Sequence, residues 1–136
     1  MSSELNVRYS VRRPGTDTLE ELQILPLAKL GQSYPLFAAL ANQRNGFSIT
    51  PIAPPRQLPV ELCVPDDPFF EHALYLTLDE MLAYDWLSPA WHRLRPTIGD
   101  SFPLHQFTRH FREMTMYALQ QFQSEGEVYM LFFIVD

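Results

Sequence analysis

The side chains best suited to binding chemistry in this 136-residue sequence are arginines, which make up nine of its ten basic residues. A guanidinium group offers a planar set of donors that fits carboxylate or phosphate. Arg44 and Asn45 close a predicted helix, and Arg56 follows twelve residues later, directly after Pro54 and Pro55. Flanking prolines present a side chain rigidly, which lowers the ordering cost of binding. We predict that Arg44, Asn45 and Arg56 bind a small anionic, nucleotide-like ligand, with internal ion pairs as the alternative.

The histidines do not form a pattern that predicts a metal site. His105 and His110 are five residues apart, which places them about 140° apart around a helix, so the two do not share one metal ion comfortably. No HExxH motif and no nucleophile elbow occurs in the sequence. We interpret His105, Arg109, His110 and Arg112 as a solvated helix face. The sequence therefore predicts neither a metal nor a cofactor.

The carboxylates and the single cysteine also favour a binding protein over an enzyme. Asp79 and Glu80 lie where the start of a helix favours negative charge, so capping explains them without acid–base catalysis. Cys63 has no adjacent base, and we interpret it as an inert, buried thiol. No catalytic residue is predicted. A small metal-dependent hydrolase or nuclease, with His72 or Asp85 in its site, is the alternative.

The composition predicts one globular domain that spans residues 1–136. Hydrophobic residues make up 46% of the chain, and a chain of this length buries enough surface to fold without disulfides. The single cysteine excludes an intrachain disulfide, and we expect a cytoplasmic protein. The longest apolar run is far shorter than the ~20 residues of a membrane span. The net charge of −6 argues against binding to bulk nucleic acid. The sequence leaves open whether the protein forms a homo-oligomer.

Three segments are predicted as strands. Apolar and polar residues alternate from Leu5 to Val11, which is typical of a half-buried strand with a polar outer face that includes Arg8. After a turn at Pro14–Asp17, the segment Leu19–Leu30 favours a second strand that forms a hairpin, with a helical turn as the alternative. Ala73–Leu76 is predicted as a short strand. Val128–Val135 shows no polar alternation, so we expect both of its faces to be covered in the centre of a sheet.

Three helices are predicted between these strands. The first runs from Ser33 to Arg44 and is ended by Asn45-Gly46. The second runs to Trp86 and begins with a capping box, in which Thr77 and Glu80 bond each other's backbone amides. The longest opens at Ser101 and Pro103 and has one apolar stripe, formed by Leu104, Phe107, Phe111, Met114, Ala118 and Phe122.

The segment Ile49–Pro68 holds half of the twelve prolines. Each proline removes a backbone donor, so this segment is predicted as an ordered loop rather than a helix or a central strand. The fold class that follows is α+β. We expect a mixed, mainly antiparallel sheet of about four strands, with two or three helices mostly on one face and the C-terminal strand in its centre.

Three blocks of the sequence resemble a family of small uncharacterised proteins of bacteriophages and prophages. Tyr34–Asn45 is similar to the family's Y-x-L-F-A-x-L-A-x-x-R-N helix, and Pro51–Pro59 is similar to its P-R-G-L-P loop. Leu76–Trp86 is similar to a later block of the family. The sequence departs from the family at Gln57, where the family's loop has glycine, and at Leu5–Arg8, where the family has a Cys-Asp-Ile-His start. The resemblance implies a phage or prophage origin and no particular activity.

Together these features predict a non-catalytic binding protein of phage or prophage type. We expect it to act against host defence, either by sequestering the small anion or by binding a host protein. Trp86 and Trp91 flank a predicted loop and are candidates for a partner surface. A virion or assembly accessory protein is a further alternative.

Overall fold

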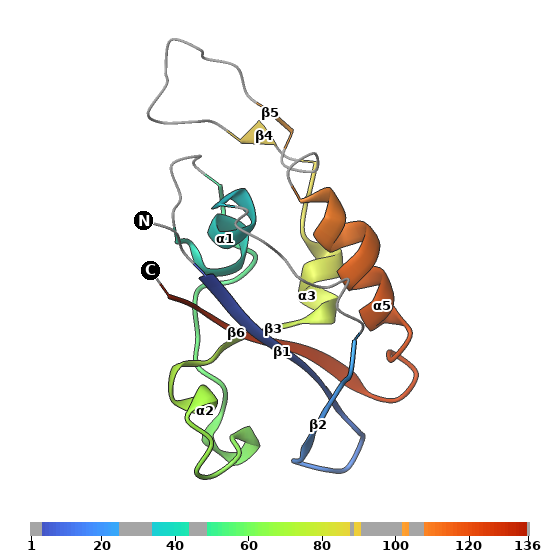
Figure 1. The fold of residues 1–136 in the computed structure, drawn as a ribbon. Coiled ribbons are helices and arrows are strands. Elements are labelled where there is room, and N and C mark those ends of the chain that lie inside the picture. The colour runs from blue at the N-terminus through green and yellow to red at the C-terminus, as the bar shows by residue number, and fades with distance from the viewer. Residues whose placement is uncertain are drawn as a thin grey trace.

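The apolar C-terminal run forms an inner strand of a four-stranded antiparallel sheet (Figure 1). The structure is a computed structural model, which describes residues 4–24, 34–43, 49–87, 89–90, 102–103 and 108–135. The strands of this sheet lie in the order β2-β1-β6-β3, and neighbouring strands are antiparallel. The predicted α+β fold with a central C-terminal strand is confirmed.

The main sheet comprises β1 (Glu4–Arg12), β2 (Leu19–Glu21), β3 (Leu74–Thr77) and β6 (Glu127–Val135). The short strands β4 (Pro89–Ala90) and β5 (Phe102–Pro103) pair with each other. The helical elements are α1 (Tyr34–Ala41), the 3₁₀ turn η2 (Val60–Leu62), α2 (Phe69–His72), α3 (Leu78–Ala83), the π-helix η3 (Phe111–Met116) and α5 (Tyr117–Gln120). None of the described helices has the length and apolar character of a membrane span.

β6 is paired along both of its edges. On one side β1 pairs with it over the full length of both strands, from Glu4 opposite Val135 to Arg12 opposite Glu127. On the other side β3 pairs with the middle of β6. β2 extends the sheet beyond β1 as the predicted hairpin. The backbone donors and acceptors in the middle of β6, residues 129–132, are therefore used within the sheet on both edges, which suits a strand without polar alternation.

The side chains of β6 alternate between two hydrophobic clusters, one on each face of the sheet. Val128, Met130 and Phe132 pack in the larger cluster, to which α1, α3 and η3 contribute. Tyr129 and Leu131 pack in a smaller cluster with the proline-rich segment and α2. Figure 1 shows α1, α3 and α5 on one side of the sheet and α2 on the other. The lack of alternation thus reflects burial on both faces, as predicted.

The first helix ends earlier than predicted. α1 stops at Ala41 because Asn42 takes the left-handed conformation (φ 55°) that closes helices. The Asn42 amide still donates to the Ala38 carbonyl at 2.9 Å. Arg44 and Asn45, where the sequence placed the helix end, lie outside the described residues.

The second predicted helix begins with the expected capping box but is shorter than predicted at its C-terminal end. The Thr77 hydroxyl accepts from the Glu80 amide at 3.2 Å, and the Glu80 carboxylate accepts from the Thr77 amide at 2.9 Å. α3 ends at Ala83, because Tyr84 takes an extended conformation (ψ 143°). The Trp86 indole N–H donates to the Met81 carbonyl at 2.7 Å and satisfies an acceptor that the helix end leaves open.

The partner-surface interpretation of the tryptophans is wrong for Trp86. Its side chain is only 7% exposed and packs against the rings of Tyr84 and Phe111. The indole N–H donates to the Met81 carbonyl of α3, so the one polar group of this side chain is satisfied while the ring is buried. Trp91 lies outside the described residues.

The longest predicted helix differs at its start and in its buried stripe. Phe102–Pro103, expected in its first turn, is instead strand β5. Helical structure is present from residue 109, and η3 is π-helical. A π-helix closes wider turns with i→i+5 bonds, so Thr115 and Met116 face the core while Met114 is 39% exposed. The 3.6-residue period placed Met114 on the wrong face for this reason.

The turn into β6 requires a glycine. A Cβ on Gly126 would lie 2.1 Å from the Arg12 carbonyl oxygen, which is closer than atoms in proteins approach. Gly15, in the β1–β2 turn, has φ 81° and open space around it. We expect Gly126→Ala to lower the free energy of unfolding by about 3 kcal/mol, because β1 must shift, and Gly15→Ala to lower it by about 1 kcal/mol through backbone strain alone. Urea denaturation of both variants tests this difference, and equal effects would contradict it.

Candidate functional site

Of the predicted anion-binding residues, the structure describes Arg56 alone; Arg44 and Asn45 lie outside the described residues. The Arg56 guanidinium donates to the Glu80 carboxylate and lies 4.2 Å from the centroid of the Tyr75 ring. Its backbone carbonyl accepts from the Tyr75 amide at 3.2 Å. Arg56 thus connects the proline-rich segment to β3 and α3 through an internal ion pair, the alternative that the sequence left open.

The Glu80 carboxylate has two structural roles, because it caps the start of α3 and pairs with Arg56. Burial raises its pKa, but hydrogen bonds from the Thr77 amide, the Arg56 guanidinium and the Thr77 hydroxyl outweigh burial and lower the pKa below its usual value. The carboxylate is therefore charged at neutral pH. A ligand that bound Arg56 would have to displace this partner, which also caps α3.

The two residues proposed for a hydrolytic site lie on opposite sides of the sheet. His72 ends α2 and contacts Phe133 with a ring-centroid distance of 6.0 Å. Asp85 follows α3 on the other face, where its carboxylate accepts from the Leu87 amide at 3.1 Å. Within the described ranges, no group of three or more His, Cys, Asp and Glu residues is placed to hold a metal ion. The geometry does not bring these two side chains into one site.

The segment after Arg56 forms a separate, charged part of the surface, which we call the acidic lobe (residues 57–72). It contains η2 and α2 and covers the smaller hydrophobic cluster (Figure 1). These sixteen residues carry Glu61, Asp66, Asp67 and Glu71, and none of the ten lysines and arginines. The lobe therefore concentrates negative charge on the face opposite α1 and α3.

α2 itself was not predicted from the sequence. Its start is set by the Asp67 carboxylate, which accepts from the Phe69 amide at 3.0 Å, and by Pro68, whose fixed φ suits a helix start. The Asp-Pro pair ahead of two phenylalanines was the available signal. The density of prolines around it favoured a loop instead.

The acidic lobe is attached to the sheet by Arg8 of β1. The Arg8 guanidinium donates to the Asp67 carboxylate at 2.6 Å and lies over the Phe69 ring, 4.3 Å from its centroid. The hydrogen bond from Arg8, followed by that from the Phe69 amide, lowers the pKa of Asp67. Sequence reasoning placed Arg8 on the polar face of its strand and did not foresee this contact, because its partners are 59 or more residues away.

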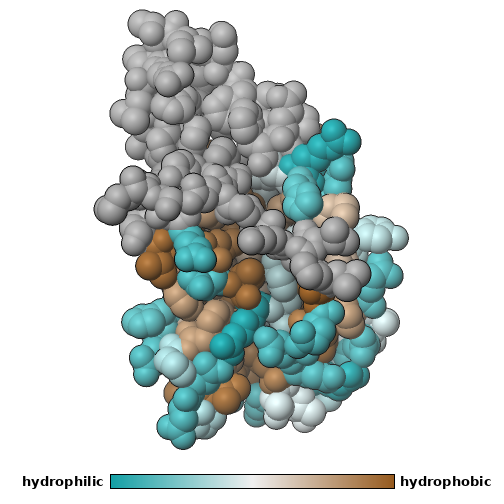
Figure 2. All heavy atoms as spheres, viewed as in Figure 1, coloured by the Kyte–Doolittle hydropathy of each residue, from teal (hydrophilic) through white to brown (hydrophobic). Residues whose placement is uncertain are grey.

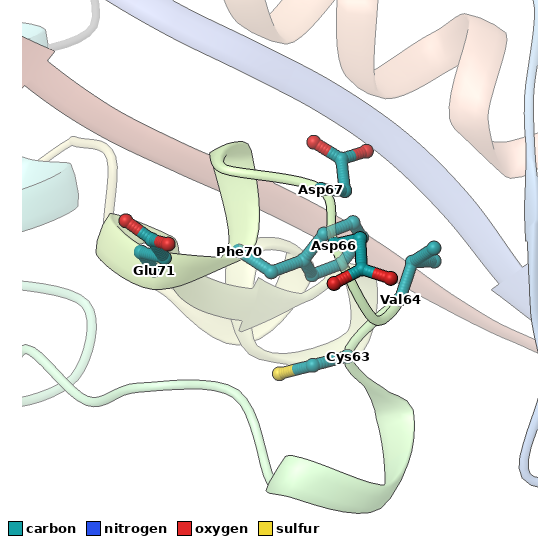
Figure 3. A pocket seen from close by; sticks show the side chains of 6 residues that line it. All are labelled: Cys63, Val64, Asp66, Asp67, Phe70 and Glu71. Carbon is teal, nitrogen blue, oxygen red and sulfur yellow. The ribbon is translucent and has the colours of Figure 1, made fainter.

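A hollow of about 250 Å³ lies in the acidic lobe beside this attachment. Figure 3 shows the Asp66 carboxylate and the Asp67 carboxylate pointing in different directions, with Asp67 toward β1. Asp66 takes a left-handed backbone conformation, with φ 65°. The Cys63 thiol is half-buried and lies 3.5 Å from the Pro59 carbonyl oxygen. The residues that line the hollow are Cys63, Val64, Asp66, Asp67, Phe70 and Glu71.

The surface around the hollow is both apolar and acidic. Val60 is 84% exposed and Val64 is 48% exposed. Glu61, Asp66 and Glu71 are exposed, and none of the three has an ion-pair partner in the part of the chain that the structure describes. In Figure 2 hydrophobic and hydrophilic atoms lie side by side in the lower part of the molecule, where Figure 1 places α2.

The attachment of the acidic lobe should depend on pH through Asp67. Its lowered pKa in the folded protein means that the ionised form stabilises the fold above the unfolded pKa of about 3.9, and that this contribution is lost as the pH falls through the folded pKa. We expect Asp67→Asn to lower the free energy of unfolding by a constant amount above about pH 5. The difference should shrink as the pH falls below the unfolded pKa toward the lowered pKa of the folded protein.

Urea denaturation of the wild type and Asp67→Asn at pH 7, 5 and 3 tests this expectation. Asp66→Asn is the matched control, because Asn also accepts the left-handed conformation. It should leave the free energy of unfolding within about 0.5 kcal/mol of the wild type at pH 7. A difference between the wild type and Asp67→Asn that stays the same down to pH 3 would contradict the role of Arg8 and Asp67.

Comparison of the chain with protein-family models, curated proteins and solved structures finds no match. The resemblance to phage and prophage proteins therefore stays a prediction.

Proposed function

We propose that the protein is a non-catalytic binding protein that engages another protein through the acidic lobe. The observation that carries this proposal is the exposure of two valines of the acidic lobe, Val64 in the lining of the carboxylate-rimmed hollow and Val60 in η2. Apolar side chains that remain in water forgo a stabilisation of about 1.5–3 kcal/mol for a fully covered valine. A partner that covers them gains this free energy, and it requires no catalytic group.

The acidic lobe is suited to binding because it is held in place before a partner arrives. Arg8 attaches it to β1 and Arg56 attaches its start to α3. Gln57 also forms a bridge with Leu74 of β3. Prolines restrict the backbone between these points. A surface that is already ordered loses little conformational entropy on association.

The phage or prophage origin, a host protein as the partner and a cytoplasmic site of action belong to the same proposal. Their support is the sequence resemblance in Tyr34–Asn45 and Pro51–Pro59. Sequestering of a small anion has less geometric support, because the Arg56 guanidinium already pairs with Glu80. Protein binding is therefore the form of the proposal that the geometry favours.

Affinity capture with matched variants tests this function. We expect the Val60→Ser/Val64→Ser double variant to fold normally, because both side chains are exposed, and to lose at least tenfold in affinity for any protein that the wild type captures. Tyr117→Ser is the control, because Tyr117 is 64% exposed on α5, across the sheet from the acidic lobe.

The captured protein is then purified and titrated by calorimetry against the wild type and both variants. Loss of binding in the double variant, with retention in Tyr117→Ser, supports the proposal. Equal affinity of the double variant and the wild type would overturn it.

A further inference from the structure

We infer that the hollow in the acidic lobe receives an arginine side chain of the partner protein. The inference rests on the proposed function and names the chemistry of the partner: a segment with an exposed arginine flanked by apolar residues. Its basis is a binding geometry that this chain already uses for two of its own arginines, in which a guanidinium lies over an aromatic ring and pairs with a carboxylate.

The first internal example is directly beside the hollow. Arg8 lies 4.3 Å from the Phe69 ring centroid and donates to Asp67 at 2.6 Å. Its guanidinium is also 6.0 Å from the Phe70 ring centroid. A planar cation gains from the negative face of a ring and from the carboxylate at the same time. Phe69 and Asp67 therefore form an arginine seat that is filled from within.

The second example lies at the start of the acidic lobe. Arg56 is 4.2 Å from the Tyr75 ring centroid and donates to Glu80. The two examples involve different strands, different rings and different carboxylates. The same arrangement of a guanidinium, a ring and a carboxylate thus occurs twice in the described part of the chain, at both ends of the segment that forms the acidic lobe.

The hollow has the same components, and two of its carboxylates remain available. Arg8 already pairs with Asp67 and lies 6.0 Å from the Phe70 ring centroid at the edge of the lining. Asp66 and Glu71 have no ion-pair partner in the described part of the chain.

In the hollow, Phe70 supplies the ring, and Asp66 and Glu71 supply exposed carboxylates. Cys63 and Val64 offer apolar walls for the methylene stem of a long side chain. The acidic lobe contains no lysine or arginine to compete for these groups. The charge of the site is thus complementary to a cation with an apolar stem.

Arginine fits this site better than lysine for a physical reason. A guanidinium is planar and weakly hydrated, so it stacks on a ring while its edge donates to a carboxylate. An ammonium group is a compact, strongly hydrated charge that gains less from the ring. Val64, which lines the hollow and is 48% exposed, extends the contact to apolar neighbours of the arginine.

NMR titration of the isotope-labelled full chain tests the inference. The probes are three peptides, acetyl-Gly-Leu-Arg-Leu-Gly-amide and the versions with lysine or glutamate in place of arginine. We expect the arginine peptide to shift the amide signals of Asp66, Phe70 and Glu71. It should bind about threefold to tenfold more tightly than the lysine peptide, and the difference in affinity from the glutamate peptide should be larger still.

Matched variants assign the binding to the hollow. Asp66→Asn keeps the left-handed backbone and should weaken the arginine peptide about threefold to fivefold. Glu61→Gln removes the same charge from the acidic lobe outside the hollow lining and should leave the affinity within twofold. Both variants are checked for folding by their amide spectra.

Equal binding of the arginine and lysine peptides would overturn the inference, as would equal weakening by Asp66→Asn and Glu61→Gln. Its failure is distinct from failure of the proposed function. If capture of a partner depends on Val60 and Val64 while the arginine peptide does not bind, the acidic lobe is a protein-binding surface without an arginine seat, and the inference alone is wrong.

Discussion

The structure depends on one constraint, which is that β6 must be covered on both faces. Its backbone is paired by β1 on one side and β3 on the other, and its side chains are apolar in both directions. Met130 and Leu131 are adjacent in the chain, point to opposite faces and are fully buried. A single layer of helices can cover only one face. The second face has to be covered by another part of the chain.

The acidic lobe is the part of the chain that meets this requirement. Leu58 and Leu62 close over Tyr129 and Leu131, and Arg8 holds the lobe to β1. A proline-rich segment forms such a cover without a long helix, at the cost of leaving some of its apolar side chains in solvent. These exposed side chains, together with the carboxylates, form the surface to which we assign binding. The need to cover the second face of β6 thus accounts both for the acidic lobe and for the surface that we propose binds a partner.

The sequence predicted what depends on local pattern and missed what depends on distant partners. The uninterrupted apolar run correctly predicted the central position of β6, and the capping box of Thr77 and Glu80 correctly predicted the start of α3. The exposure of Met114 was missed because a π-helix changes the period. The arginine seats pair residues at separations of 24 and 59 along the chain. No spacing rule connects such residues, so Arg56 was assigned to a ligand and Arg8 to solvent.

The most direct test of the account compares two neighbouring residues of β6 by urea denaturation. Met130→Ala removes side-chain volume from the face with α1 and α3, and Leu131→Ala removes it from the face under the acidic lobe. If β6 is covered on both faces, each substitution lowers the free energy of unfolding by about 2–5 kcal/mol, while Val135→Ala, at a half-exposed position, costs much less. A cost below about 0.5 kcal/mol for Leu131→Ala, the range of surface substitutions, would contradict coverage of the second face.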